Sequence, residues 1–195
     1  MFGEAGIGKS RLSFEMRSQL RKIGSVSWLT CQADQILKKP LNPFIYFLKN
    51  YFEQSFENTE IQNIESFEKK YLNLYHDERL IAHEEASQIR RELSRTKSIL
   101  AAQVGINSSS SLWQQLDAKG RYQNTLAALS NLLVAESCLQ PVVLELEDAH
   151  WFDLDSIEFL QDFARKMTRH PIFVLVTSRY DDNGEKVHLF SRETL

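Results

Sequence analysis

The stretch that decides the fold lies at residues 3–10 and reads Gly3-Glu4-Ala5-Gly6-Ile7-Gly8-Lys9-Ser10. It satisfies every fixed position of the phosphate-loop pattern G-x-x-x-x-G-K-[ST]. In such a loop, glycines let backbone amides approach phosphate groups without a Cβ in the way. The lysine reaches the terminal phosphates and the hydroxyl binds Mg²⁺. We therefore predict that residues 3–10, together with Arg11, bind a nucleotide, and that Ser10 is also a metal ligand. The alternative is a glycine-rich turn before a surface helix.

The residues after this loop have the period of a helix. From Lys9 to Ile23, four apolar side chains recur on one helical face: Leu12, Met16, Leu20 and Ile23. Gly24 can end this helix. The loop would therefore open into a helix whose N-terminal amides and positive dipole end converge on an anion.

Only Met1 and Phe2 precede the loop. A phosphate loop normally follows a buried parallel strand, whose end directs the loop towards the nucleotide. Either the chain is a fragment that begins just inside its first strand, or these two residues must serve as that strand; we favour the fragment.

Composition places the chain among ordinary globular proteins. It has 195 residues, of which 43% are hydrophobic and 25% charged, and its formal net charge is −3. This balance gives no electrostatic footprint for nucleic acid or for an anionic membrane. No apolar run is long enough to span a bilayer and no leader precedes the loop, so we expect a cytoplasmic protein. Cys31 and Cys138 lie far apart without further ligand residues, which favours two buried, reduced thiols.

The remaining elements follow from periodicity and from capping residues. Apolar runs predict strands at 26–31, 142–146 and 172–176. Helices are predicted at 9–23, 43–52 with Asn42 as the cap, 55–75, 77–103, 117–137 and 155–168, with a loop at 107–111. For the last helix, either Asp153 or Asp155 is the expected cap. After Tyr180 no clear element is predicted. The whole chain then forms one α/β domain with a helical insert at about 32–140.

Three polar clusters end three of these segments: Lys9-Ser10, Glu147-Asp148 and Thr177-Ser178-Arg179. In a parallel sheet the carboxyl ends of the strands lie on one edge, so we expect the clusters to converge there. One carboxylate of the acidic pair would hold Mg²⁺ and the next would orient or deprotonate the attacking water. Arg179 would stabilise charge on the terminal phosphate.

Each of these clusters also has a plainer interpretation. The acidic pair could simply cap a turn after its strand, and Arg179 could belong to a surface ion pair. His150, beside the acidic pair, is expected to be structural. Glu145 is an anomaly, a carboxylate inside an otherwise apolar strand, where it would face a solvent gap or pair with a buried cation.

Together, residues 3–12, 146–153 and 177–179 resemble the signal-transduction ATPases of the AAA+/STAND group. More narrowly, they resemble the modules attached to bacterial-type adenylate and guanylate cyclases, large LuxR-type regulators and multidomain kinases. The resemblance implies a P-loop NTPase sheet of order 5-1-4-3-2, binding of ATP and Mg²⁺, and slow hydrolysis that serves as a switch. It makes Lys9 and Ser10 the Walker A pair, Glu147 and Asp148 the Walker B pair, with Glu147 as the metal ligand, and Arg179 the sensor-1 residue.

The sequence departs from this family in three respects, one of which is that Glu147 stands where many P-loop ATPases have aspartate. Most of the first strand is absent, as are the fifth strand and the helical lid that would follow Leu195. In the family order the absent first strand would lie beside the strand at 172–176. We therefore expect that strand to be an exposed edge, and the isolated chain to bind ATP weakly and to self-associate.

The predicted function is an ATP-binding, Mg²⁺-dependent hydrolase that acts as a regulatory switch within a larger signal-transduction or transcription-regulating protein. Its expected partners are ATP and flanking output domains or other proteins, without direct nucleic-acid or membrane contact. The alternative is a nucleotide-gated or catalytically silent interaction scaffold that uses the insert at 32–140. A GTPase is disfavoured because no Asn-Lys-x-Asp motif follows the loop. A small-molecule kinase stays open, since the loop does not reveal which molecule receives the phosphoryl group.

Overall fold

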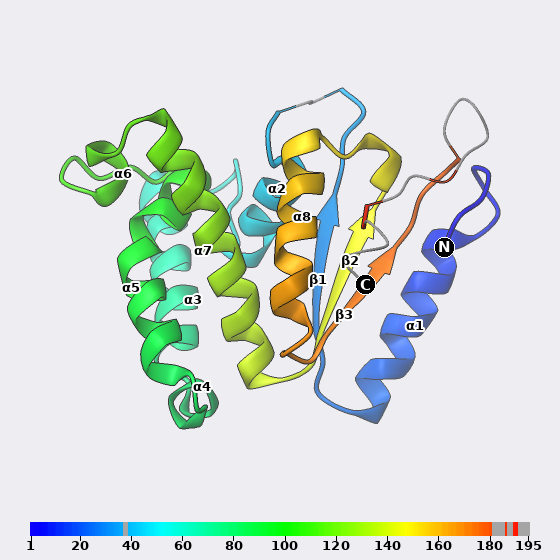
Figure 1. The fold of residues 1–195 in the computed structure, drawn as a ribbon, viewed down its shortest axis with the longest axis horizontal. Coiled ribbons are helices and arrows are strands. Elements are labelled where there is room, and N and C mark those ends of the chain that lie inside the picture. The colour runs from blue at the N-terminus through cyan, green and yellow to red at the C-terminus, as the bar shows by residue number, and fades with distance from the viewer. Residues whose placement is uncertain (37–38, 181–185, 187–188, 191–195) are drawn as a thin grey trace. The chain divides into compact units, whose positions relative to one another are not determined.

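The computed structural model describes residues 1–36, 39–180, 186 and 189–190. The chain divides into two compact units (Figure 1). The first, which we call the sheet unit, contains Met1–Phe47 and the chain from Gln140 onward. The second, the helical unit, is Leu48–Leu139 and is narrower than the predicted insert. Most of the stretch after Tyr180 lies outside the described residues.

The sheet unit is built on three parallel strands in the order β1-β2-β3. They are β1 (Ser27–Gln32), β2 (Val142–Glu147) and β3 (Ile172–Val176). Strand β2 is central and almost fully buried, which its near-continuous apolar sequence favours. The three predicted strands are confirmed, although β1 begins one residue later than expected and β2 includes Glu147.

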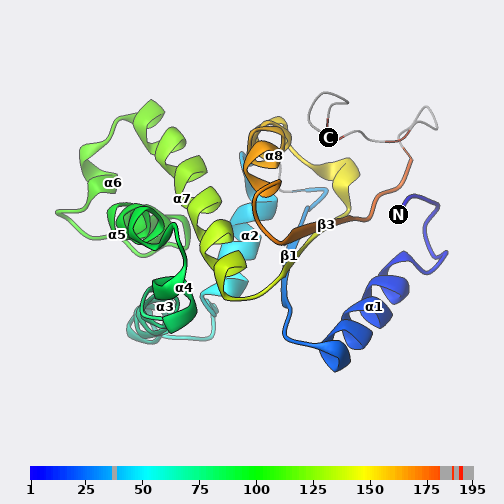
Figure 2. The same cartoon turned by 60° about the horizontal axis from the view of Figure 1, so that its bottom comes forward.

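Helices lie on both faces of this sheet, as Figures 1 and 2 show. Helix α1 (Lys9–Ile23) is on one face. The other carries α8 (Leu154–Met167) and the start of α2 (Asn42–Tyr51). There, Phe44 packs edge-on against Phe159 with ring centroids 4.6 Å apart. A short 3₁₀ helix, η1 (Ala149–Trp151), joins β2 to α8. The predicted α/β fold class is therefore confirmed.

Helix α1 has the predicted length, but the apolar face expected from the sequence is not its buried face. Leu12 and Ile23 are 59% and 82% exposed, and the residue that α1 buries is Ser13. Met16 and Leu20 are half-buried. The reason is a polar contact: the Ser13 hydroxyl donates a hydrogen bond to the buried Glu145 carboxylate of β2. This contact turns the serine side of the helix towards the sheet.

Phe2 lies beside the continuation of β3. It forms a parallel bridge with Ser178, and the Gly3 amide donates to the Ser178 carbonyl over 3.3 Å. The residues just before the loop therefore occupy the position expected for the family's first strand, next to β3.

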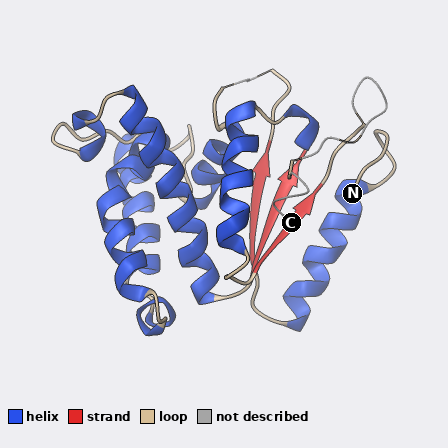
Figure 3. Ribbon diagram, viewed as in Figure 1, coloured by secondary structure: helices blue, strands red, loops and turns tan. Residues whose placement is uncertain are grey.

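The helical unit contains α3 (Glu60–Tyr75), α4 (Glu78–Ala82), α5 (Ala86–Gln103), α6 (Leu112–Gln115) and α7 (Ala118–Leu139). Figure 3 shows helices joined by loops throughout this unit. Helix α5 packs along α7, and Phe52 packs against Phe67 with ring centroids 4.4 Å apart. The buried Tyr51 hydroxyl donates to Glu136 of α7.

Two helix predictions in this unit need correction. The stretch 77–103 is not one helix: it breaks at 83–85, where His83 is extended (φ −69°, ψ 143°) and its amide donates to the Leu80 carbonyl, so that α4 ends. Helix α3 begins at Glu60 rather than at 55, because Thr59 and Gln62 form a capping box there. The loop at 107–111 is confirmed. In the part of the chain that the structure describes, no helix has the length and apolar character needed to cross a membrane.

Candidate functional site

The loop at 3–10 has the backbone that its glycines allow. Gly3 has φ 153°, a backbone conformation that strains any residue with a side chain, and a Cβ there would also displace Cδ1 of Ile7, which lies 2.1 Å away. Gly8, with φ 97°, is the residue before α1, and no side chain caps the helix there. The first-turn amides of α1 are therefore left without a side-chain acceptor, which is the arrangement that an anion can use.

Lys9 is folded back over this loop. Its Nζ donates to the Gly3 carbonyl over 2.7 Å and to the Glu4 carbonyl over 2.9 Å. These two carbonyl acceptors hold the ammonium group at the mouth of the loop. A phosphate that bound there would compete with them for the same donor.

The other predicted loop residues lie at the surface. The exposed set comprises Glu4, Ala5, Gly6, Ile7, Gly8, Ser10 and Arg11. Arg11 makes an ion pair with Glu15, one turn further along α1, with 3.6 Å between the charged atoms.

The acidic pair stands where β2 ends. Glu147 is half-buried, and its pKa is raised above the ordinary carboxyl value by burial first, then by the nearby charges of Glu145 and Asp148. Asp148 has a left-handed backbone, with φ 54°. Such a conformation is uncommon outside glycine and is tolerated best by Asp and Asn. It turns the chain sharply directly after β2 ends at Glu147.

The third cluster is hydrogen-bonded to the second. The Ala149 amide donates to the Thr177 carbonyl over 3.0 Å, and the Asp148 amide donates to Thr177 Oγ1 over 3.4 Å. The amide of Arg179 donates to His150 Nδ1 over 3.3 Å, while the Arg179 side chain is exposed. With the bond from Gly3 to Ser178, the three clusters meet at the carboxyl ends of β2 and β3. The structure thus brings the acidic pair and Thr177-Ser178-Arg179 together and places the start of the loop beside them, while the roles of Lys9 and Ser10 at this edge stay predictions.

His150 makes a structural contact in this arrangement. Burial lowers the pKa of its imidazole, with smaller contributions from Asp148, which raises it, and from Arg179 and Lys9, which lower it. Its Nδ1 accepts the Arg179 amide, and its buried Nε2 has no hydrogen-bond partner among the described residues. The only signal for this role in the sequence is the position of His150 two residues after Asp148.

Glu145 is explained by neither of the two expected environments. It is 4% exposed, so it faces no solvent gap, and among the described residues it forms no ion pair. Its carboxylate instead accepts hydrogen bonds from Ser13 Oγ, from Trp28 Nε1 over 2.6 Å and from Thr30 Oγ1 over 3.1 Å. Sequence reasoning missed these partners because they come from two distant elements, α1 and β1.

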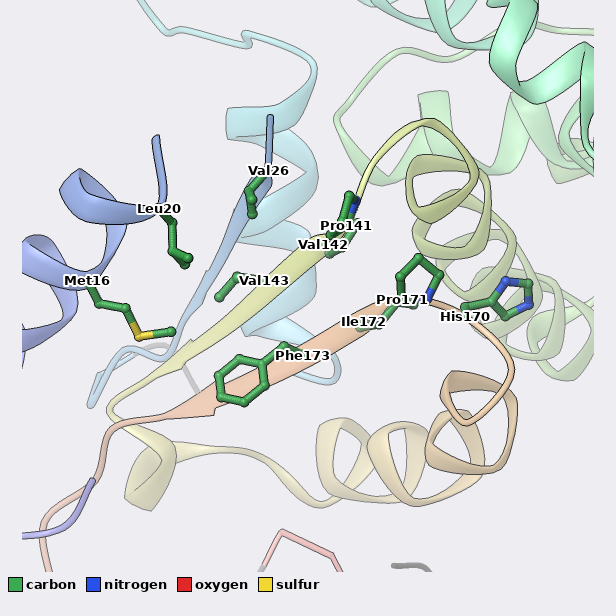
Figure 4. A pocket seen from close by; sticks show the side chains of 10 residues that line it. All are labelled: Met16, Leu20, Val26, Pro141, Val142, Val143, His170, Pro171, Ile172 and Phe173. Atoms are coloured by element: carbon green, nitrogen blue, oxygen red, sulfur yellow. The ribbon is translucent and has the colours of Figure 1, made fainter. Parts of the chain in front are cut away.

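A cavity of about 480 Å³ lies at the opposite ends of the strands (Figure 4). Its lining is almost entirely apolar and includes Met16, Leu20, Val143 and Phe173. None of the predicted site residues lines it.

Comparison with known proteins identifies the family. The family model described as "AAA ATPase domain" matches residues 2–176. No curated protein and no solved structure gives a significant match. Because the family match covers most of the 195 residues, this chain belongs to the AAA ATPase domain family and is an AAA+ P-loop ATPase module.

Proposed function

We propose that this module binds Mg-ATP at the carboxyl edge of its sheet and hydrolyses it slowly, as the regulatory switch of a larger signal-transduction or transcription-regulating protein. The observation that carries the proposal is the convergence of the three polar clusters. Hydrogen bonds join the loop to Ser178 and join the acidic pair to Thr177. Phosphate, metal and water ligands would thus meet at one edge of the sheet.

The loop residues fit a triphosphate. The uncapped N-terminus of α1 supplies backbone donors, and the exposed Gly6 and Gly8 before it have no atom within 4 Å of the position that a Cβ would take. Lys9 would exchange its two carbonyl acceptors, from Gly3 and Glu4, for phosphate oxygens. This exchange is favourable because hydrogen bonds to ionised groups are stronger than bonds to neutral carbonyls.

Ser10 and Glu147 fit a magnesium ion that also binds the phosphates. Mg²⁺ prefers oxygen ligands and usually takes one or two carboxylates together with substrate phosphates. The pKa of Glu147 is raised first by burial and then by the charges of Glu145 and Asp148, and a cation bound there would act in the opposite direction. When bound, the ion would neutralise charge that develops on the phosphates.

Asp148 and Arg179 would complete the chemistry. The turn at Asp148 presents a second carboxylate beside Glu147, where it could orient the attacking water and accept its proton. Arg179, on the neighbouring strand end, would stabilise charge on the terminal phosphate. Its backbone is tied to His150, so the Arg179 segment and the Asp148 turn would move together.

The direct test compares three variants in the same protein. Lys9→Ala removes the proposed phosphate ligand and should abolish measurable ATP binding by calorimetry. Asp148→Asn keeps the left-handed backbone and should bind ATP but lose turnover by about 10²-fold or more. Lys22→Ala, at the exposed far end of α1, is the matched control and should change neither. Unchanged ATP affinity in Lys9→Ala would refute the proposed site.

The catalytically silent scaffold stays as a second candidate because the helical unit exposes large apolar side chains. Phe56 is fully exposed and Ile61 is mostly exposed. Such side chains could bind a protein partner, and nucleotide would then only gate that binding. This candidate would be favoured over the ATPase by intact ATP binding with phosphate release at background level, together with partner binding that Phe56→Ala abolishes.

A further inference from the structure

A buried polar network connects α1 to the sheet. Glu145 of β2 lies at its centre and accepts hydrogen bonds from Ser13 of α1 and from Trp28 and Thr30 of β1. The Arg17 guanidinium, one helical turn after Ser13, lies 5.9 Å from the centroid of the Trp28 ring. We call these five residues the Glu145 network.

The donors in this network suit an ionised carboxylate. An indole N–H can only donate, and both hydroxyls donate to the same carboxyl group. A buried carboxylate costs stability even when it is well bonded, and an apolar side chain in a central strand would usually avoid that cost. Stability alone therefore gives no reason for a glutamate at the centre of this sheet.

The position of the network suggests what the glutamate does. Ser13 is three residues after Ser10, so both lie on one side of α1, a single turn apart. Glu145 is two residues before Glu147, so both point to the same face of β2. The bond from Ser13 to Glu145 thus joins the helix that begins with Lys9 and Ser10 to the strand that ends in Glu147.

We propose that Glu145 is a positioning residue for nucleotide hydrolysis. Its hydrogen bonds hold α1 against β1 and β2. They thereby set how Lys9 and Ser10, at the start of α1, are aligned with Glu147 and Asp148, at the end of β2. The inference rests on the proposed function, since alignment matters only if phosphate and attacking water bind on these two elements. Misplacement of reacting groups by about 1 Å can cost about 10²-fold in rate, so a firm tie between helix and strand has a catalytic value.

The Glu145 network contains a tryptophan, Trp28, whose fluorescence can report on the position of α1. Trp28 donates to the same carboxylate that Ser13 contacts, so a change in the position of α1 alters the environment of the indole. In a Trp113→Phe, Trp151→Phe background, Trp28 is the sole tryptophan and its emission can be followed. We expect ATP to change this emission when Ser13 and Glu145 are both present, and to change it much less in Ser13→Ala.

The kinetic experiment separates positioning from binding. Ser13→Ala and Glu145→Val should each lower kcat about ten-fold, while the ATP dissociation constant changes by less than about three-fold. The kcat of the double variant should be no lower than that of either single variant, because both substitutions remove the same hydrogen bond between α1 and β2. Glu145→Gln keeps an acceptor for Trp28 and a polar group for Ser13, and should retain kcat within about three-fold of the unmodified protein. Ser18→Ala, a serine on the same helix outside the network, is the matched control.

The outcomes are distinguishable. If the unmodified protein does not bind or hydrolyse ATP, the proposed function fails and the inference falls with it. If it does both, but Ser13→Ala retains kcat and the ATP response of Trp28, then the inference alone is overturned and Glu145 has only a structural role. If Glu145→Val does not fold, Ser13→Ala still decides, because it removes one hydroxyl and leaves the carboxylate in place.

Discussion

The backbone conformation at Gly3 limits which residue types the loop tolerates at that position. The φ of 153° at Gly3 is rarely adopted by residues with a side chain, and a Cβ would in addition push the exposed Ile7 side chain aside. We expect Gly3→Ala to destabilise the protein by about 1–3 kcal/mol. Gly24→Ala, where the backbone is extended and nothing lies near the added Cβ, should be close to neutral. Thermal unfolding of the two variants checks this, and equal melting temperatures would contradict it.

The burial of the two cysteine thiols predicts how their alkylation rate depends on pH. Cys31 is buried and its pKa is raised by burial, while Cys138 is only half-buried and burial raises its pKa to about 11, with a smaller contribution from Glu85. The expectation of two buried thiols thus holds fully for Cys31 only. Because the thiolate is the reactive form, about a thousandth of Cys138 is reactive at pH 8. The alkylation rate of Cys138 should rise about ten-fold per pH unit up to about pH 10. In denaturant the thiol is no longer buried, so its alkylation at pH 8 should be faster than in the folded protein. Rapid alkylation of the folded protein at pH 8 would argue against this environment.

At the scale of elements, the start of α8 depends on one of two neighbouring aspartates. Asp153 is the cap: its Oδ1 accepts the Ser156 amide over 2.9 Å and the Leu41 amide over 3.0 Å. It therefore fixes the helix start and the loop before α2 at once. Asp153→Ala should lower the free energy of unfolding by about 1–3 kcal/mol. Asp155→Ala, one residue inside the first turn, should cost only about 0.5 kcal/mol through the helix dipole. Urea unfolding measures both, and an equal effect would refute the assignment.

At the scale of the whole molecule, the outer side of β3 is the prominent open surface of the sheet unit. Phe173 is 55% exposed, and Ile172 and Phe173 line apolar cavities on both faces of the sheet. On that side of β3, the described residues pair only at the N-terminus of the chain: the Met1 amino group donates to the Val176 carbonyl over 2.6 Å, and Phe2 forms its bridge with Ser178. An apolar strand edge of this kind is a template for association.

We therefore expect the 195-residue chain to self-associate through β3. Phe173→Lys should shift sedimentation towards the monomer, because a charged side chain on an edge strand opposes pairing with another edge. Phe56→Lys removes a fully exposed aromatic ring from the helical unit and should leave the association unchanged. The expectation fails if the unmodified chain is monomeric at tens of micromolar, or if both variants behave alike.

Much of the fold and of the candidate site could be predicted from local patterns. The loop at 3–10 follows from eight consecutive residues. The strands β2 and β3 follow from continuous apolar runs, and the polar residues after them indicate the edge where ligands would meet. Each of these signals is complete within a short window of sequence, and the structure places the windows side by side. The helix break at 83–85 was missed because the apolar period continues through it.

What the sequence by itself determined is therefore the α/β class, the phosphate loop and the set of residues that converge at one edge of the sheet. The tertiary structure alone decided which side of α1 is buried, which aspartate caps α8 and which partners Glu145 has. The physical reason is distance along the chain. Glu145 is satisfied by donors more than a hundred residues away, and one of them, Ser13, turns its own side of α1 to the sheet in place of the apolar face that local periodicity predicted.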